Sequence, residues 1–254
     1  MKSLVEYSSS SDSEDAAEAG SPPAPSAKKM RLPLPSQIKT MKLNSIHEVP
    51  VDDPSKHDGR VRSFQHERGN WATFVYVPVD VPILDDLQNS LIKSPLIDVE
   101  LKPSSGIHIS LTKTVVLQHH WIDSFVSSVR NELVLTKKFR IQFQHLKVYC
   151  NEDRTRTFIG LKVNSGMTQQ LDAISKRLDT VLKEYRLPEF YKDPSFHCSI
   201  LWCAGDHETK FNAILKDLET IFQSYFIKSS EEFQMAVNTI LCKTGNKLFR
   251  FELS

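Results

Sequence analysis

Strand and helix patterns alternate along the chain from about residue 70 to its end, and their order repeats once. Stretches rich in β-branched and aromatic residues predict strands, whereas apolar residues three and four positions apart predict amphipathic helices. The order strand–helix–strand–helix–strand is followed by strand–helix–strand–helix–strand–strand, which predicts an α+β protein of two related lobes. The predicted strands are 71–79, 107–112, 139–149, 155–163, 196–202, 233–242 and 248–253, and the predicted helices are 81–94, 119–135, 167–186 and 208–226.

The first 66 residues lack this pattern. Residues 8–36 contain eight serines, five prolines and almost no aliphatic residues before Leu32, so they cannot bury enough apolar surface to offset the entropy of ordering. Residues 37–66 contain turn formers and little periodicity. We predict an acidic, serine/proline-rich disordered tail and linker over 1–66 and one folded domain over 67–254. A short basic cluster (Lys28, Lys29, Arg31) is compatible with nuclear import.

Composition excludes several classes of protein. The formal net charge of the 254 residues is +1, so a binding site for a polyanion must be a local patch rather than a property of the whole surface. The four cysteines include no C-x-x-C pair, which argues against a zinc knuckle or a disulfide framework and favours reduced thiols inside the cell. No run approaches the roughly 18 apolar residues of a membrane helix. The N-terminus lacks the apolar core of a secretory signal.

Two short segments share the pattern apolar-His-x-Ser-aliphatic. One contains His108 and Ser110, the other contains His197 and Ser199, and each lies in a predicted strand of a different lobe. Two such motifs are expected by chance only about 2% of the time for this composition. A single histidine in a strand is usually structural, but the pair in equivalent positions favours a functional site.

The spacing of the motif has a physical meaning. Strand side chains alternate between faces, so the histidine and the serine of each motif point the same way, while Ile109 and Cys198 point into the core. If the lobes face each other, two imidazoles and two hydroxyls share a cleft. A histidine with a pKa of about 6.5 can accept or donate a proton near neutrality. The hydroxyls can bind the non-bridging oxygens of a phosphate in the transition state, and no metal is required.

With these paired motifs the chain resembles the 2H phosphoesterase superfamily. Residues 189–199, 154–158 and 201–203 further resemble the U6 small nuclear RNA phosphodiesterase family, and the similarity extends from about residue 67 to the end. The resemblance implies the 2H phosphoesterase fold: two pseudo-symmetric lobes, each an antiparallel sheet flanked by helices, with a central cleft. It also implies a nuclear 3′–5′ exoribonuclease that trims the uridine-rich end of U6 RNA. Members of the family commonly leave a 2′,3′-cyclic phosphate, and some process it further.

Carried over by position, the resemblance makes His108 and His197 the general acid and base, and Ser110 and Ser199 the phosphate-holding hydroxyls. One histidine takes the proton of the penultimate 2′-hydroxyl, which attacks the adjacent phosphorus, and the other protonates the departing 5′ oxygen. The sequence does not say which histidine has which role. No cofactor or metal is expected, and the implied partner is the single-stranded, uridine-rich 3′ end of an RNA, bound by a monomer away from any membrane.

Three more residues are candidates for substrate binding. Tyr191 matches the tyrosine on which a terminal base stacks in the family, and Ser195 lies close to it in the same stretch. Glu152 lies in a predicted hairpin turn, where contact with a nucleobase edge and simple solvation are equally compatible with the sequence. Arg154 and Arg156 face either the cleft or water, and we assign neither of them a catalytic role.

Two other functions stay open. One is a different 2H activity, either hydrolysis of 2′,3′-cyclic phosphates or chemistry on 2′,5′ linkages. The other is a catalytically idle RNA-binding module, which the two intact motifs argue against because binding alone requires no imidazole pair. Metal-dependent chemistry is disfavoured because His119, His120, His145 and His207 lack the spacing of known metal-binding motifs.

Overall fold

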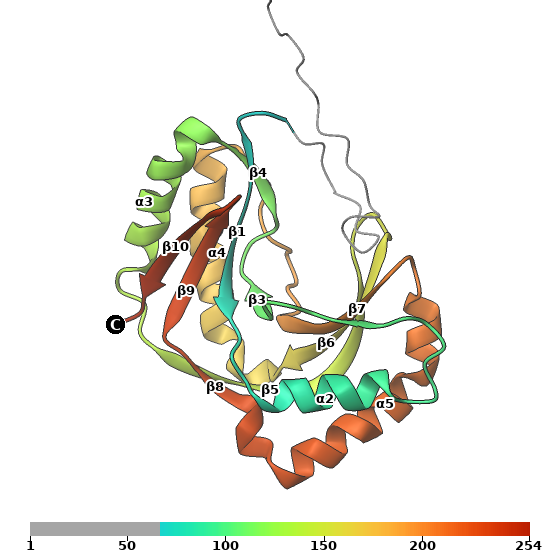
Figure 1. Ribbon diagram of the computed structural model, residues 1–254. Helices are drawn as coiled ribbons and strands as arrows, with labels where there is room; N and C mark the ends of the chain where they lie inside the picture. Colours follow the sequence, from blue (N-terminus) through green and yellow to red (C-terminus); the bar gives the residue numbers. More distant parts are fainter. Residues whose placement is uncertain (1–66) are drawn as a thin grey trace, which may run out of the picture. The chain divides into compact units, whose positions relative to one another are not determined.

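The computed structural model describes residues 67–254 (Figure 1), and the predicted tail and linker, with their basic cluster, lie outside the described residues. The strands are β1 (Asn70–Pro78), β2 (Lys102–Pro103), β3 (His108–Ser110), β4 (Val115–Gln118), β5 (Phe139–Cys150), β6 (Arg156–Val163), β7 (His197–Ala204), β8 (Gln234–Val237), β9 (Thr239–Thr244) and β10 (Lys247–Glu252). The α-helices are α2 (Ile83–Ile92), α3 (Ile122–Leu133), α4 (Gln169–Glu184) and α5 (Glu208–Lys228).

The strands of residues 67–254 form one antiparallel sheet in the order β10-β9-β1-β3-β7-β6-β5-β8. Two short strands extend it, because β2 pairs with β7 and β4 pairs with β1. The two predicted lobes are therefore two halves of a continuous sheet, which join where β3 pairs with β7. The predicted α+β fold class is confirmed, and the joint between the halves is the place where the two motifs lie.

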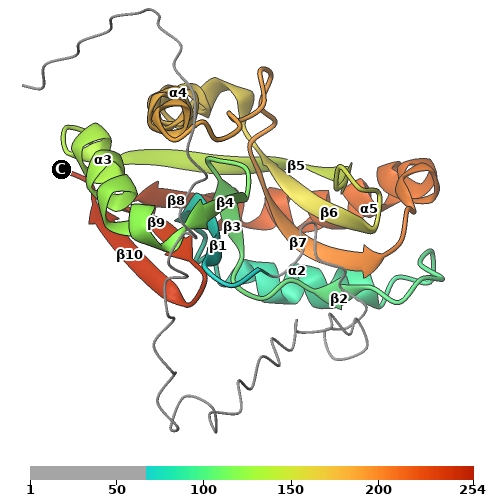
Figure 2. The same ribbon diagram turned by 90° about the horizontal axis from the view of Figure 1, so that it is seen from above.

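Helices α2 and α4 each pack against elements of the other half of the domain. Helix α2 follows β1 in the chain but lies against α5 and β7 in the other half, while α4 follows β6 but lies beside α3 (Figures 1 and 2). Side-chain hydrogen bonds fix both pairings. Gln88 Nε2 donates to the Ile200 carbonyl at 2.6 Å, and Arg177 donates to the Glu132 carbonyl at 2.7 Å. Each half of the sheet is thus covered partly by a helix from the opposite repeat.

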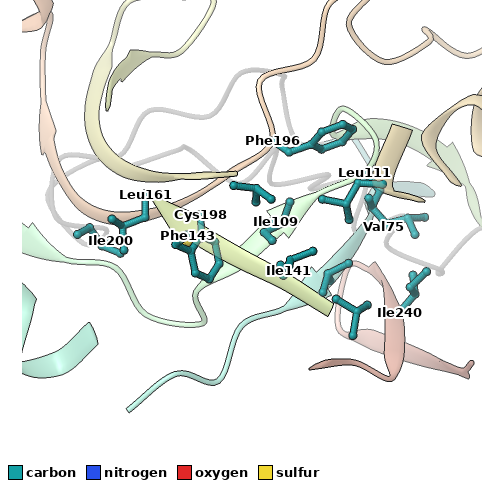
Figure 3. Packing of buried hydrophobic residues seen from close by; sticks show 14 of the residues in the cluster. Val75, Ile109, Leu111, Ile141, Phe143, Leu161, Phe196, Cys198, Ile200 and Ile240 are labelled. Carbon is teal, nitrogen blue, oxygen red and sulfur yellow. The ribbon is translucent and has the colours of Figure 1, made fainter. Parts of the chain in front are cut away.

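The core follows from the alternation that the sequence shows. In β1 the side chains of Val75 and Val77 are fully buried, while those of Phe74 and Tyr76 on the other face are only partly buried. Figure 3 shows Ile109 and Cys198 within the same apolar cluster as Val75. Because the side chains on one face of the sheet pack in this core, the side chains on the opposite face can be polar. No helix within residues 67–254 is both long and apolar enough to span a membrane.

One predicted strand is in fact two. Residues 233–242 were predicted as one strand, but the structure has β8 and β9, separated by Asn238. Strand β8 pairs with β5 at one edge of the sheet, and β9 pairs with β1. Val237 and Thr239 are both buried on either side of the exposed Asn238, so the alternation of faces continues through the break. The local pattern therefore could not reveal it.

Candidate active site

The two H-x-S motifs lie on neighbouring strands and face each other. Strands β3 and β7 pair antiparallel with Ile109 opposite Cys198, and both of these side chains are fully buried. In this register His108 lies opposite Ser199, and Ser110 lies opposite His197, all four on the other face of the sheet. Directly opposed residues have Cβ atoms about 4.5–5.5 Å apart, so the four polar side chains are close enough to contact one phosphate group.

Both imidazoles are held in the same way. His108 Nδ1 lies 2.8 Å from the Gly106 carbonyl oxygen, and His197 Nδ1 lies 2.6 Å from the Ser195 carbonyl oxygen. A carbonyl oxygen only accepts, so Nδ1 of each ring carries the proton and donates it. The lone pair of the neutral ring is then on Nε2. Each motif thus holds its histidine through the carbonyl two residues earlier, and each histidine has Nε2 available for proton transfer.

Burial keeps both histidines neutral. It is the largest cause that lowers the pKa of His108 from its ordinary value of 6.5, and the charge of Lys243 acts in the same direction. Burial also lowers the pKa of His197, to about 4, with smaller contributions from Lys147 and from His108 itself. A charge on His108 therefore disfavours a charge on His197. At pH 7 the free protein presents two neutral rings, and a phosphate dianion or monoanion between them would favour the protonated form of either ring.

A tyrosine that the sequence analysis did not select covers His197. The rings of Tyr149 and His197 are stacked, with centroids 3.5 Å apart and an interplanar angle of 10°. The Tyr149 hydroxyl lies 3.0 Å from Ser195 Oγ. Gly160 leaves room for this stack, because a Cβ atom there would lie 3.1 Å from both His197 Cδ2 and Tyr149 Cε2. In the sequence Tyr149 is simply the last residue of a predicted strand, so no motif could have indicated this contact.

The predicted substrate-binding residues Tyr191 and Glu152 lie together, bridged by a lysine. Lys113 Nζ lies 2.7 Å from Glu152 Oε1 and 4.4 Å from the centroid of the Tyr191 ring. The hydrogen bond from Lys113 is the largest cause that lowers the pKa of Glu152. The Tyr191 side chain is 49% exposed, so part of its ring is accessible to a ligand. Lys113 follows Ser110 by three residues, but nothing in its spacing marked it beforehand.

Comparison with known proteins shows to which family this site belongs. A family model described as "HVSL: Uncharacterised conserved protein" matches residues 32–252. The "U6 snRNA phosphodiesterase 1" of Danio rerio is 43% identical over 226 residues, which cover 88% of this chain and 81% of that protein. The protein of the same name from Drosophila melanogaster is 40% identical over 260 residues, which cover 98% and 99%. The chain belongs to the U6 snRNA phosphodiesterase family.

Solved structures agree with this membership at the level of the fold. The structure of Kluyveromyces marxianus Usb1 superposes with a TM-score of 0.54 at 14% sequence identity, and covers 74% of this chain and 99% of that chain. The same protein solved with uridine monophosphate gives a TM-score of 0.53 at 13% identity. At this identity the likeness shows a common fold alone.

In this member of the U6 snRNA phosphodiesterase family, two more residues that the sequence analysis considered, Ser195 and Arg154, make defined contacts. Ser195 was predicted to bind substrate, and in the structure its carbonyl holds His197 while its hydroxyl contacts Tyr149. Arg154 adopts a positive φ of 53° in the hairpin turn and donates to Asp206 and Glu208 at 2.5 and 2.8 Å. It therefore ties the β5–β6 hairpin to the start of α5. Within residues 67–254 no cluster of three or more histidine, cysteine or acidic side chains is placed to hold a metal.

Proposed function

We propose that this chain is a metal-independent 3′–5′ exoribonuclease that trims the oligouridine 3′ end of U6 small nuclear RNA and leaves a 2′,3′-cyclic phosphate. The observation that carries the proposal is the facing pair of H-x-S motifs on β3 and β7, with both imidazoles held through Nδ1. Membership of the U6 snRNA phosphodiesterase family supports the choice of RNA. The name of the relatives supports this substrate, and the arrangement of the site supports this chemistry.

In the proposed reaction each of the four side chains has one role. Nε2 of one histidine accepts the proton of the 2′-hydroxyl on the penultimate ribose, and the 2′ oxygen forms a bond to the adjacent phosphorus. The bond from phosphorus to the 5′ oxygen of the last nucleoside breaks, and the other histidine, which is protonated on Nε2 when the negatively charged phosphate is bound, donates that proton to the departing oxygen. Ser110 and Ser199, which lie between the imidazoles on the same face, donate hydrogen bonds to the non-bridging oxygens as charge develops on them.

The terminal base is proposed to bind at Tyr191. The exposed ring of Tyr191 offers a stacking surface, and such a stack is worth about 1–3 kcal/mol for any base. Lys113 and Glu152 beside it provide one hydrogen-bond donor group and one acceptor group for the edge of the base. A single-stranded 3′ end can reach this position, whereas a base inside a duplex is already stacked and paired.

We further propose that the protein acts as a monomer in the nucleus. Both motifs come from one chain and meet within it, so a complete pair of imidazoles requires no second copy. The proposed RNA substrate implies a nuclear site of action, and the basic cluster Lys28, Lys29 and Arg31 would serve import.

The decisive experiment uses RNA ending in a short uridine tract. We expect stepwise loss of 3′ nucleotides in the presence of EDTA and a 2′,3′-cyclic phosphate at the new end, detected by mass spectrometry. A matched RNA with a single 2′-deoxy residue at the penultimate position should resist cleavage, because it lacks the nucleophile. Cleavage of an all-deoxy substrate would rule out the mechanism.

The same assay separates the alternatives. Opening of a cyclic-phosphate nucleotide without trimming of the uridine tract would indicate a different 2H activity. Intact 3′ ends, together with unchanged RNA affinity in a variant carrying both His108→Ala and His197→Ala, would indicate an idle binding module.

A further inference from the structure

An aromatic pair on β1 lies next to the first catalytic candidate. The rings of Phe74 and Tyr76 are stacked on each other, with centroids 4.9 Å apart and an interplanar angle of 24°. Their centroids lie 5.5 and 5.1 Å from that of the His108 ring. We call Phe74 and Tyr76 the β1 aromatic pair. Both side chains are partly exposed on the face of the sheet that carries the H-x-S motifs.

The position of this pair is unusual for a purely structural role. The core side of β1 is already filled by Val75 and Val77, which are fully buried. The β1 aromatic pair instead projects from the opposite face, where Tyr76 lies opposite Ser110 of the first motif. Large apolar side chains that face a polar site rather than the core are typical of ligand-binding surfaces.

The aromatic residue beside the other histidine, Tyr149 of β5, cannot serve in this way. The ring of Tyr149 is stacked directly on His197, and its hydroxyl is bound to Ser195. One face of that ring is therefore occupied by the imidazole, and Lys147 Nζ lies 5.2 Å from its centroid. The two histidines thus have different aromatic neighbours. Tyr149 packs directly on His197, whereas the β1 aromatic pair lies farther from His108 and stays partly exposed.

Lys243 adds a positive charge beside the β1 aromatic pair. Lys243 of β9 lies directly opposite Phe74 and is exposed. Its charge lowers the pKa of His108, in keeping with its place beside Phe74, whose ring is 5.5 Å from that imidazole. Aromatic rings beside a cation are the combination that binds a nucleoside and its phosphate in single-stranded nucleic acids.

The order of the strands indicates which nucleoside would bind there. Strands β1 and β7 lie on opposite sides of β3, and Tyr191, the proposed site of the 3′-terminal base, belongs to the segment that leads into β7. A phosphodiester held between the imidazoles has one nucleoside on each side. With the terminal nucleoside at Tyr191, the nucleoside on the 5′ side extends toward β1 and β9.

We infer that the β1 aromatic pair binds the penultimate nucleoside of the RNA, the one whose 2′-hydroxyl attacks, and that Lys243 binds the phosphate on its 5′ side. This inference rests on the proposed function. It adds a second base-binding surface to the site, so the enzyme holds both nucleosides that flank the cleaved bond. Such positioning on both sides keeps the attacking oxygen in line with the leaving oxygen.

The first test removes the penultimate base without removing its ribose. Two uridine-tailed RNAs are compared, one with uridine at the penultimate position and one with an abasic ribonucleotide that keeps its 2′-hydroxyl. The wild-type kcat/KM should fall about 5- to 150-fold for the abasic RNA, which is the value of one base–aromatic stack. In Phe74→Leu, which removes one of the two rings, the preference for the RNA with the penultimate base should be markedly smaller.

The control is Phe249→Leu, since Phe249 on β10 lies opposite Cys242 and therefore on the other face of the sheet. This variant should keep the full preference of the wild type. An equal rate on both RNAs for the wild type, or the full preference in Phe74→Leu, would overturn the inference. If the wild type cleaves neither RNA, the proposed function itself fails, so the two failures are distinguishable.

The second test examines the phosphate with the dinucleotides UpU and pUpU. The wild type should cleave pUpU with a higher kcat/KM than UpU, and Lys243→Gln should lose this advantage. The ratio of the two substrates cancels any change that the variant causes at His108. Lys247→Gln, on the same hairpin with its Nζ 5.6 Å from the Trp71 ring centroid, is the matched control and should keep the advantage. A preserved ratio in Lys243→Gln contradicts the assignment of Lys243.

Discussion

At the scale of single residues, the chemistry of the site depends on what surrounds His197. Tyr149 covers one face of its ring, the Ser195 carbonyl holds Nδ1, and Lys147 and His108 oppose a positive charge on it. None of these neighbours is an acid, and the hydrogen bond to the Ser195 carbonyl, which favours the imidazolium, is outweighed by burial. The phosphate of a bound substrate brings a negative charge next to both rings, and its binding is expected to raise the pKa of both histidines.

This environment predicts a pH-dependent stability. The pKa of His197 is about 4 in the folded protein and about 6.5 when unfolded. Between these pH values the unfolded chain binds more protons than the folded protein. The contribution of neutral His197 to the free energy of unfolding is therefore present above pH 6.5 and is lost as the pH falls toward 4. The stability difference between the wild type and His197→Asn should therefore shift by about 3 kcal/mol against the wild type from pH 7 to pH 4. Urea unfolding at both pH values measures it, and a constant difference would contradict the prediction.

Gly160 provides a second prediction at this scale. A methyl group there would lie 3.0 Å from the Cys198 carbonyl oxygen, which is backbone, and 3.1 Å from the rings of His197 and Tyr149. Gly160→Ala should lower the free energy of unfolding by about 1–3 kcal/mol and reduce kcat more than it raises KM, because the imidazole is displaced. Gly166→Ala, whose new Cβ would meet only Asn164 Oδ1 at 3.4 Å, is the control. Equal effects of the two variants would show that the stack does not matter.

At the scale of elements, the segment that carries Tyr191 is held by helix α4. Asp179 Oδ1 accepts a hydrogen bond from the Phe190 backbone N–H at 2.7 Å, and Lys183 forms an ion pair with Glu189 at 2.8 Å. A cavity of about 310 Å³ lies between this segment and α4, with Ser175 and Tyr191 among its lining residues. These two contacts attach the segment to α4 just before Tyr191, and the cavity lies behind the tyrosine. They therefore help to position its ring.

Loss of the Asp179 contact should therefore affect binding more than chemistry. In Asp179→Ala the Phe190 N–H loses its acceptor, and the Tyr191 ring becomes less well positioned. We expect a severalfold rise in KM for uridine-tailed RNA with kcat nearly unchanged. Asp172→Ala, which removes only an exposed ion pair with Lys176 on the same helix, should leave KM close to the wild-type value. A fall in kcat alone in Asp179→Ala would argue against this role.

The same elements show what the sequence could and could not predict. Strand alternation placed His108 and Ser110 on one face and Ile109 in the core, because that rule depends only on local geometry. It could not reveal that β3 pairs with β7, or that β8 and β9 part at Asn238, because pairing is decided by residues far away in the chain. Lys113 and Tyr149 were missed for the same reason: their partners are 39 and 46 residues distant.

At the scale of the whole domain, helices α2 and α4 tie the two halves of the sheet together. Helix α2 joins the first repeat to β7 through Gln88, and α4 joins the second repeat to α3 through Arg177. Neither half can therefore move away from the other without breaking buried contacts. A fixed distance between the imidazoles is what a reaction needs when it uses two proton-transfer groups on one phosphate.

Because both imidazoles belong to one chain, the site should not be shared between copies. His108→Ala and His197→Ala should each lower kcat by about 10²- to 10⁴-fold, since each removes one proton-transfer partner. Mixing the two variants in equal amounts should restore nothing, as neither chain contains a complete pair. Wild-type activity should rise linearly with protein concentration. Recovery of activity in the mixture would mean that β3 of one copy pairs with β7 of another, a swapped arrangement that the continuous sheet of a single chain does not require.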